Sequence, residues 1–94
     1  MENKKENKES EGIIYVGGKG FLVYLNAANM QLQNNEVIVI KSRGKFINRA
    51  VDVSEVLKRQ CGTKTEEIKI DSETFKTEEG RDIRVSTIEI VVRK

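Results

Sequence analysis

The sequence predicts a two-layer α/β (α+β) domain with the element order βαβαββ, in which a mixed four-stranded sheet carries two helices on one face. Three observations lead to this fold class. Two short runs, residues 13–16 and 36–42, have the β-branched composition of buried strands. Each is followed by a segment with apolar residues at helical spacing. The last third of the chain alternates apolar and polar residues on both sides of a turn, which indicates a long C-terminal β-hairpin.

The first strand and helix are separated by a glycine-rich loop. The run Ile-Ile-Tyr-Val at 13–16 is stopped by Gly-Gly-Lys-Gly at 17–20, which predicts a flexible loop. From Phe21 onward the apolar side chains recur at helical spacing as far as Leu32. This predicts an amphipathic helix of about 13 residues, ended by the polar residues 33–35.

The second strand and helix follow at once. Residues 36–42 form a continuous apolar run flanked by charge, which predicts a central strand covered by helices. Apolar residues then return at helical spacing from Phe46 to Leu57, and Gly62 is the predicted C-terminal stop.

The hairpin is predicted from alternation. Ile68 and Ile70 alternate with polar residues, which indicates a half-buried strand. Residues 77–80, Thr-Glu-Glu-Gly, form the turn, and alternation resumes from Ile83 to Val92.

The 94-residue chain has room for one domain. Residues 1–11 contain no apolar residue after Met1, so we expect a disordered charged tail followed by a domain at 12–94. No apolar run approaches the roughly 20 residues of a membrane span, and we expect no membrane partner.

The residue types present argue against an active site, a bound cofactor and a metal site. The chain has no histidine and one cysteine, which excludes an intrachain disulfide and leaves no zinc site. Cys61 is interpreted as a small apolar residue at a helix end. Asp52 and Glu55 are one helical turn apart, but without histidine or a metal-ligand cluster they do not make an active site. We therefore expect a protein that is not an enzyme.

The most informative motif is Lys-Ser-Arg-Gly-Lys-Phe-Ile at 41–47, which places three cations around a glycine at a strand-to-helix turn. Such turns expose backbone N–H groups and a positive helix end, which attract phosphate. Arg49 follows Lys45 by four residues, so a helix beginning at Lys45 would present both on one face. No carboxylate occurs between residues 37 and 51. These features predict a polyanion-binding surface, with an ordinary solvated loop as the alternative.

Three separated motifs together resemble the Alba family of small nucleic-acid-binding proteins over residues 13–94. They are the Gly/Lys loop followed by Tyr24 and Ala28, the stretch EVIVIKSRGKFINRAVDVSEVLKR, and the terminal GRDIRVSTIEIVVRK. The resemblance implies the βαβαββ fold, a homodimer, and binding of double-stranded DNA, RNA or both with little sequence preference. It also implies a chromatin protein that coats and compacts chromosomal DNA, located in the cytoplasm of an archaeal cell and associated with the chromosome. The alternative is an RNA-binding subunit of an RNase P-type ribonucleoprotein that acts mainly through protein pairing, including heterodimers with a paralogue.

The resemblance also implies which residues contact nucleic acid. Lys19 matches a loop lysine that is acetylated in archaeal members, and acetylation there would weaken phosphate binding. Gly44 matches the glycine that lets the backbone turn close to the ligand. The remaining contacts are basic positions of the central motif and of the hairpin: Arg43, Lys45, Arg49, Arg81 and Arg84.

Three positions depart from the family pattern. Gly18 replaces the first loop lysine and Gly20 replaces the proline after the lysine pair, so the loop has less charge and more flexibility. Cys61 replaces a phenylalanine that supports contacts between dimers in many archaeal members. We therefore expect weaker cooperative coating of DNA.

Overall fold

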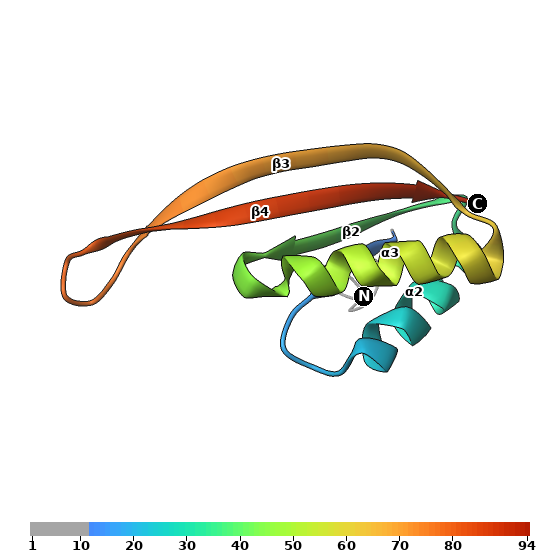
Figure 1. Ribbon diagram of the computed structural model, residues 1–94, viewed down its shortest axis with the longest axis horizontal. Coiled ribbons are helices and arrows are strands. Elements are labelled where there is room, and N and C mark those ends of the chain that lie inside the picture. Colours follow the sequence, from blue (N-terminus) through green and yellow to red (C-terminus); the bar gives the residue numbers. More distant parts are fainter. Residues whose placement is uncertain (1–11) are drawn as a thin grey trace, which may run out of the picture.

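The computed structural model describes residues 12–94 as a four-stranded sheet with two helices packed against it (Figure 1). The predicted fold class and element order are confirmed. The predicted tail, residues 1–11, lies outside the described residues. The elements in chain order are β1 (Ile13–Val16), α2 (Phe21–Asn34), β2 (Val37–Arg43), a short 3₁₀ turn η1 (Gly44–Phe46), α3 (Ile47–Cys61), β3 (Lys64–Lys76) and β4 (Asp82–Arg93).

The sheet is mixed, with the strand order β1-β2-β4-β3. The strands β1 and β2 are parallel and are joined by the crossover helix α2, whereas β4 is antiparallel to both of its neighbours. Ile14, Ile40 and Ile90 lie opposite one another in this register. Because side chains alternate between the faces of a sheet, these three residues point to the same face.

Both helices cover that face, and the hydrophobic core lies between the two layers (Figure 1). Ile38 and Ile40 of the central strand β2 are fully buried, as the continuous apolar run predicted. Ser42 is also on this face, and its hydroxyl donates a hydrogen bond to the Val16 carbonyl over 2.9 Å. That bond satisfies a buried polar group and ties the ends of β1 and β2 together.

The helix boundaries follow from local chemistry. The second helix begins at Ile47 rather than at Lys45, because residues 44–46 form the 3₁₀ turn. It ends at Gly62 as predicted, where the glycine adopts a left-handed φ of 69° and its N–H donates to the Lys58 carbonyl. Within the described residues, neither helix is long and apolar enough to cross a membrane.

The hairpin extends beyond the sheet as an arm, formed by residues 72–76 of β3 and 82–86 of β4 (Figure 1). The last pair between β2 and β4 is Arg43 with Thr87, so beyond it β3 and β4 pair only with each other. Five further residues of β4 carry the arm roughly 17 Å past the body.

The prediction that β3 is half-buried is wrong for this chain, since Ile68 and Ile70 are 57% and 77% exposed. The helices cover β1, β2 and β4 and leave the outer strand β3 uncovered.

Candidate nucleic-acid interface

The loop at 17–20 and the turn η1 lie beside each other at one edge of the sheet. The carboxyl ends of parallel strands share an edge, and these two segments follow the parallel strands β1 and β2. Gly18 lies against the Phe46 ring, because a Cβ added there would be 3.6 Å from a ring carbon. The edge therefore presents Lys19 from the loop, Arg43 from the end of β2 and Lys45 from the turn.

The loop is fixed by two side chains from the helices. The Lys19 backbone N–H donates to the Tyr24 hydroxyl over 2.9 Å. The Arg49 guanidinium donates from one nitrogen to the carbonyls of Gly17 and Lys19, at 3.0 and 2.7 Å. These bonds orient the backbone on both sides of Gly18 and leave the Lys19 side chain exposed.

Arg49 and Lys45 do not share a helix face as predicted. We expected Arg49 and Lys45 to lie one turn apart on a helix face, but Lys45 precedes the helix and its ammonium lies 5.6 Å from the centre of the Phe46 ring. The guanidinium of Arg49 instead turns toward the loop carbonyls. These bonds position the backbone of the loop that carries Lys19.

Replacing Arg49 with alanine should destabilise the domain, because two loop carbonyls lose a charged donor. Hydrogen bonds to charged groups support an expected loss of about 1–3 kcal/mol in the free energy of unfolding. A domain of this size should then show a Tm lower by roughly 5 °C or more in a thermal melt followed by circular dichroism. Arg59→Ala, an exposed arginine on the same helix, is the matched control. Equal melting temperatures for the two variants would contradict the role assigned to Arg49.

The Arg43 side chain contacts two residues of the arm. Its guanidinium lies 3.6 Å from the Glu73 carboxylate and 5.1 Å from the centre of the Phe75 ring. The sequence contains no acid near Arg43, but the antiparallel pairing of β3 with β4 brings Glu73 next to it. Because both partners are more than half exposed, the ion pair leaves Arg43 accessible to a phosphate that competes with Glu73.

Gly44 adopts a φ of +63°, in the left-handed region that other residues rarely occupy. A Cβ at this position would meet only the Val85 side chain, at an ordinary contact distance of 3.5 Å. Backbone conformation, rather than lack of space, therefore explains the glycine between Arg43 and Lys45.

Arg81 and Arg84 lie apart from this edge. Arg81 belongs to the turn at the tip of the arm, and Arg84 lies opposite Thr74 in the arm itself. Both are exposed. The predicted residues thus form two groups, an edge group on the body (Lys19, Arg43 and Lys45, with Arg49 behind them) and an arm group (Arg81 and Arg84).

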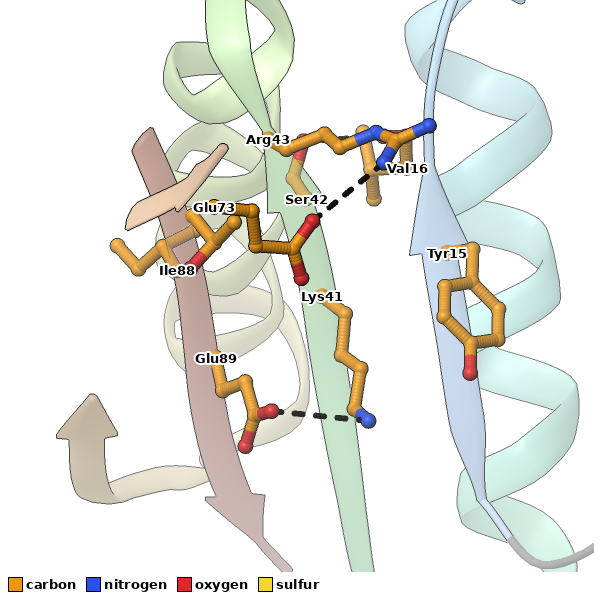
Figure 2. Close-up of a pocket in the computed structure, with 9 residues that line it drawn as sticks. Tyr15, Val16, Lys41, Ser42, Arg43, Glu73, Ile88 and Glu89 are labelled. Atoms are coloured by element: carbon orange, nitrogen blue, oxygen red, sulfur yellow. Dashed lines mark hydrogen bonds and ion pairs between the residues drawn. The ribbon is translucent and has the colours of Figure 1, made fainter. Parts of the chain in front are cut away.

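The opposite face of the sheet, away from the helices, holds residues that the sequence prediction did not include. Figure 2 shows a hollow there, in which the ends of Lys41 and Glu89 approach each other beside the ring of Tyr15. The Lys41 ammonium is 3.6 Å from the Glu89 carboxylate. Alternation along β1, β2 and β4 indicates that Tyr15, Lys41 and Glu89 each point to the open face. Only the register between the strands shows that the three side chains lie in one row.

Two other expectations concern catalysis and Cys61. Cys61 is the last residue of α3, so its predicted place at a helix end is confirmed. It is exposed, however, and its thiol donates to the Asn29 side-chain oxygen over 3.2 Å, so it does not act as an apolar residue there. Asp52 and Glu55 do not converge on a site, since Glu55 pairs with Lys58. Among the described residues, no three histidine, cysteine or acidic side chains group as metal ligands.

The sequence profile of the Alba family matches residues 12–72, which is more than half of the chain. The chain belongs to the Alba family. Its relatives include the DNA/RNA-binding protein Alba of Thermoplasma acidophilum, 44% identical over 87 residues, which cover 89% of this chain and 97% of the relative. The protein of the same name from Nitrosopumilus maritimus is 39% identical over 92% of this chain and 94% of its own length. Both names describe binding proteins rather than enzymes.

Solved Alba structures share the fold. Alba from Thermoplasma volcanium superposes with a TM-score of 0.80 at 42% identity, covering 88% of this chain and all of the other. An Alba protein of Trypanosoma brucei gives a TM-score of 0.73 at 26% identity, covering 88% of this chain and 68% of its own. The Alba profile ends at residue 72, so the arm group of cations lies beyond the matched segment.

Proposed function

We propose that this Alba protein is a non-enzymatic DNA- and RNA-binding protein that contacts phosphates with little sequence preference and coats or compacts chromosomal DNA. In this proposal it works in the cytoplasm, associated with the chromosome. It needs no cofactor, and residues 1–11 are a tail outside the binding domain. Acetylation of the exposed Lys19 would lower its affinity for nucleic acid.

One observation carries the proposal: Lys19, Arg43 and Lys45 gather at a single edge of the sheet, at the base of the arm. Lys19 and Lys45 have no carboxylate partner among residues 12–94. A cationic edge with a projecting arm suits an extended polyanion, because a duplex lying on the edge also passes the arginines of the arm. Phosphate contacts of this kind position a protein without reading bases.

The proposed working unit is a homodimer. Ile68 and Ile70 of β3 and Val51 of α3 are exposed apolar side chains on neighbouring elements. Ile70 also borders a hollow of about 400 Å³ with Ile47. A small domain that leaves such side chains uncovered gains stability by burying them against a second copy. The dimer would present two edge groups and two arms to one ligand.

The second candidate is an RNA-binding or RNase P-type subunit that acts mainly through pairing with another protein, including a paralogue. It is favoured by the outer edge of β3, which has no strand partner among the described residues and carries acidic side chains such as Glu67 and Asp71. Mixing the chain with a candidate paralogue distinguishes the two proposals. A heterodimer that melts higher than either homodimer would favour the second candidate.

Binding should first be compared for matched duplex DNA, duplex RNA and single-stranded RNA at one salt concentration by fluorescence anisotropy. We expect tight duplex binding, and Lys45→Ala should weaken it by about tenfold or more because a dimer would lose two phosphate contacts. Arg59→Ala removes the same charge far from the edge and should bind like the wild type. A clear preference for RNA would favour the second candidate, and no binding to any of the three would contradict the proposed function.

A further inference from the structure

The hollow on the open face of the sheet has a composition unlike the cationic edge (Figure 2). It has a volume of about 550 Å³, within the range of ligand sites, and lies over β1, β2 and β4. Its two cations, Lys41 and Arg43, face two carboxylates, those of Glu89 and Glu73. Because the Lys41–Glu89 pair is balanced in charge, this part of the hollow suits a phosphate group less well than the cationic edge, to which Arg43 also belongs.

The register aligns three side chains in one row across the hollow. Tyr15 lies opposite Lys41, and Lys41 lies opposite Glu89. The Tyr15 side chain is exposed, with 69% of the residue accessible, and the Lys41 ammonium is 5.7 Å from the centre of its ring. An exposed aromatic ring on an open sheet face is a stacking surface for an unpaired base. The row therefore combines a stacking surface, a hydrogen-bond donor and an acceptor.

We propose that this row binds an unpaired guanine of a single-stranded nucleic acid, with the base stacked on Tyr15 and its edge toward Lys41 and Glu89. The inference rests on the proposed function and adds a base-binding site to its phosphate contacts. Adjacent strands are about 4.8 Å apart, so Glu89, two strands from Tyr15, is within reach of the edge of a stacked purine.

The polar groups of the row select guanine. Lys41 only donates hydrogen bonds and an ionised Glu89 only accepts them. Cytosine and adenine also carry an amino donor beside an acceptor, but guanine alone places two donors, its ring N–H and its amino group, next to the acceptor O6. One carboxylate can accept from both donors while the ammonium donates to O6. Uracil has acceptors on both sides of its single N–H, and one of them would face the carboxylate. In a duplex this edge is occupied by the pairing partner, so the site requires an unpaired base.

The site can be tested with two heptamers, the RNA UUUGUUU and the RNA U₇, and a mixed-sequence DNA duplex as reference. Wild-type protein should bind UUUGUUU more tightly than U₇. Tyr15→Leu should weaken binding of UUUGUUU by roughly 5- to 150-fold, the range for loss of one stacked base. Tyr15→Phe keeps the ring and should bind like the wild type, and duplex binding should stay within about twofold in both variants. Glu89→Gln should bring the ratio between the heptamers toward one.

Each outcome bears on a different claim. If Tyr15→Leu leaves heptamer binding unchanged while the duplex binds normally, the base site is wrong and the proposed function stands. If wild-type protein binds neither the duplex nor the heptamers, the proposed function itself fails. The DNA versions of the heptamers should depend on Tyr15 in the same way, since the row does not address the ribose. A dependence confined to RNA would show recognition of the sugar and would overturn the base assignment.

Discussion

The affinity of this protein for duplex DNA should fall by about 10⁴-fold between 50 and 200 mM salt. The structure reduces the number of free cations expected from the sequence, because Arg43 is paired with Glu73 and Arg49 is bound to the loop carbonyls. Four exposed cations per protomer remain: Lys19, Lys45, Arg81 and Arg84. The proposed dimer would then neutralise about eight phosphates, and the slope of log affinity against log salt concentration should be about −7.

Charge-removing variants test whether these cations set the salt slope. Lys19→Gln removes one charge per protomer, as acetylation would, and should make the slope shallower by about two. Lys58→Gln, which lies on α3 and pairs with Glu55, is a control that should leave the slope unchanged. The slope is measured from anisotropy titrations at five or more salt concentrations. A wild-type slope near zero would rule out phosphate contact as the source of affinity.

Most of the fold could be predicted from the sequence because its signals are local. The apolar run containing Ile38 and Ile40 is continuous, as in a strand buried beneath helices, and Gly62 ends the second helix as predicted. The first turn of that helix was predicted less well. Residues 44–46 form a 3₁₀ turn and Gly44 has a left-handed φ, neither of which the letter sequence alone specifies.

The candidate site was predicted less completely, since contacts between distant segments are invisible along the chain. Arg43 has no acid nearby in the sequence, yet the hairpin places Glu73 3.6 Å away. Arg49 lies 30 residues from Lys19 and donates a hydrogen bond to its carbonyl, a contact that the sequence does not indicate. Charge patterns located the cationic edge, whereas the partners of each cation depend on strand register and helix placement.

Replacing both Ile68 and Ile70 with glutamine should produce a monomer and weaken duplex binding by about 10²-fold or more. The two side chains are exposed on one face of β3, so the change removes apolar area from the proposed dimer interface without altering charge. A monomer offers four phosphate contacts instead of eight, so the salt slope should also halve to about −3.5. The loss in affinity follows because two linked sets of contacts bind far more tightly than either set alone.

The matched control changes two other exposed apolar residues, Leu22→Gln and Met30→Gln on α2, which are 64% and 65% exposed. This control should remain a dimer in sedimentation equilibrium, with wild-type affinity and salt slope. Both double variants should keep a wild-type circular dichroism spectrum, because none of the four side chains belongs to the buried core. A dimer that persists without Ile68 and Ile70 would place the interface elsewhere. A monomer that retains wild-type affinity and slope would show instead that one protomer supplies all the phosphate contacts, and that the second copy serves another purpose.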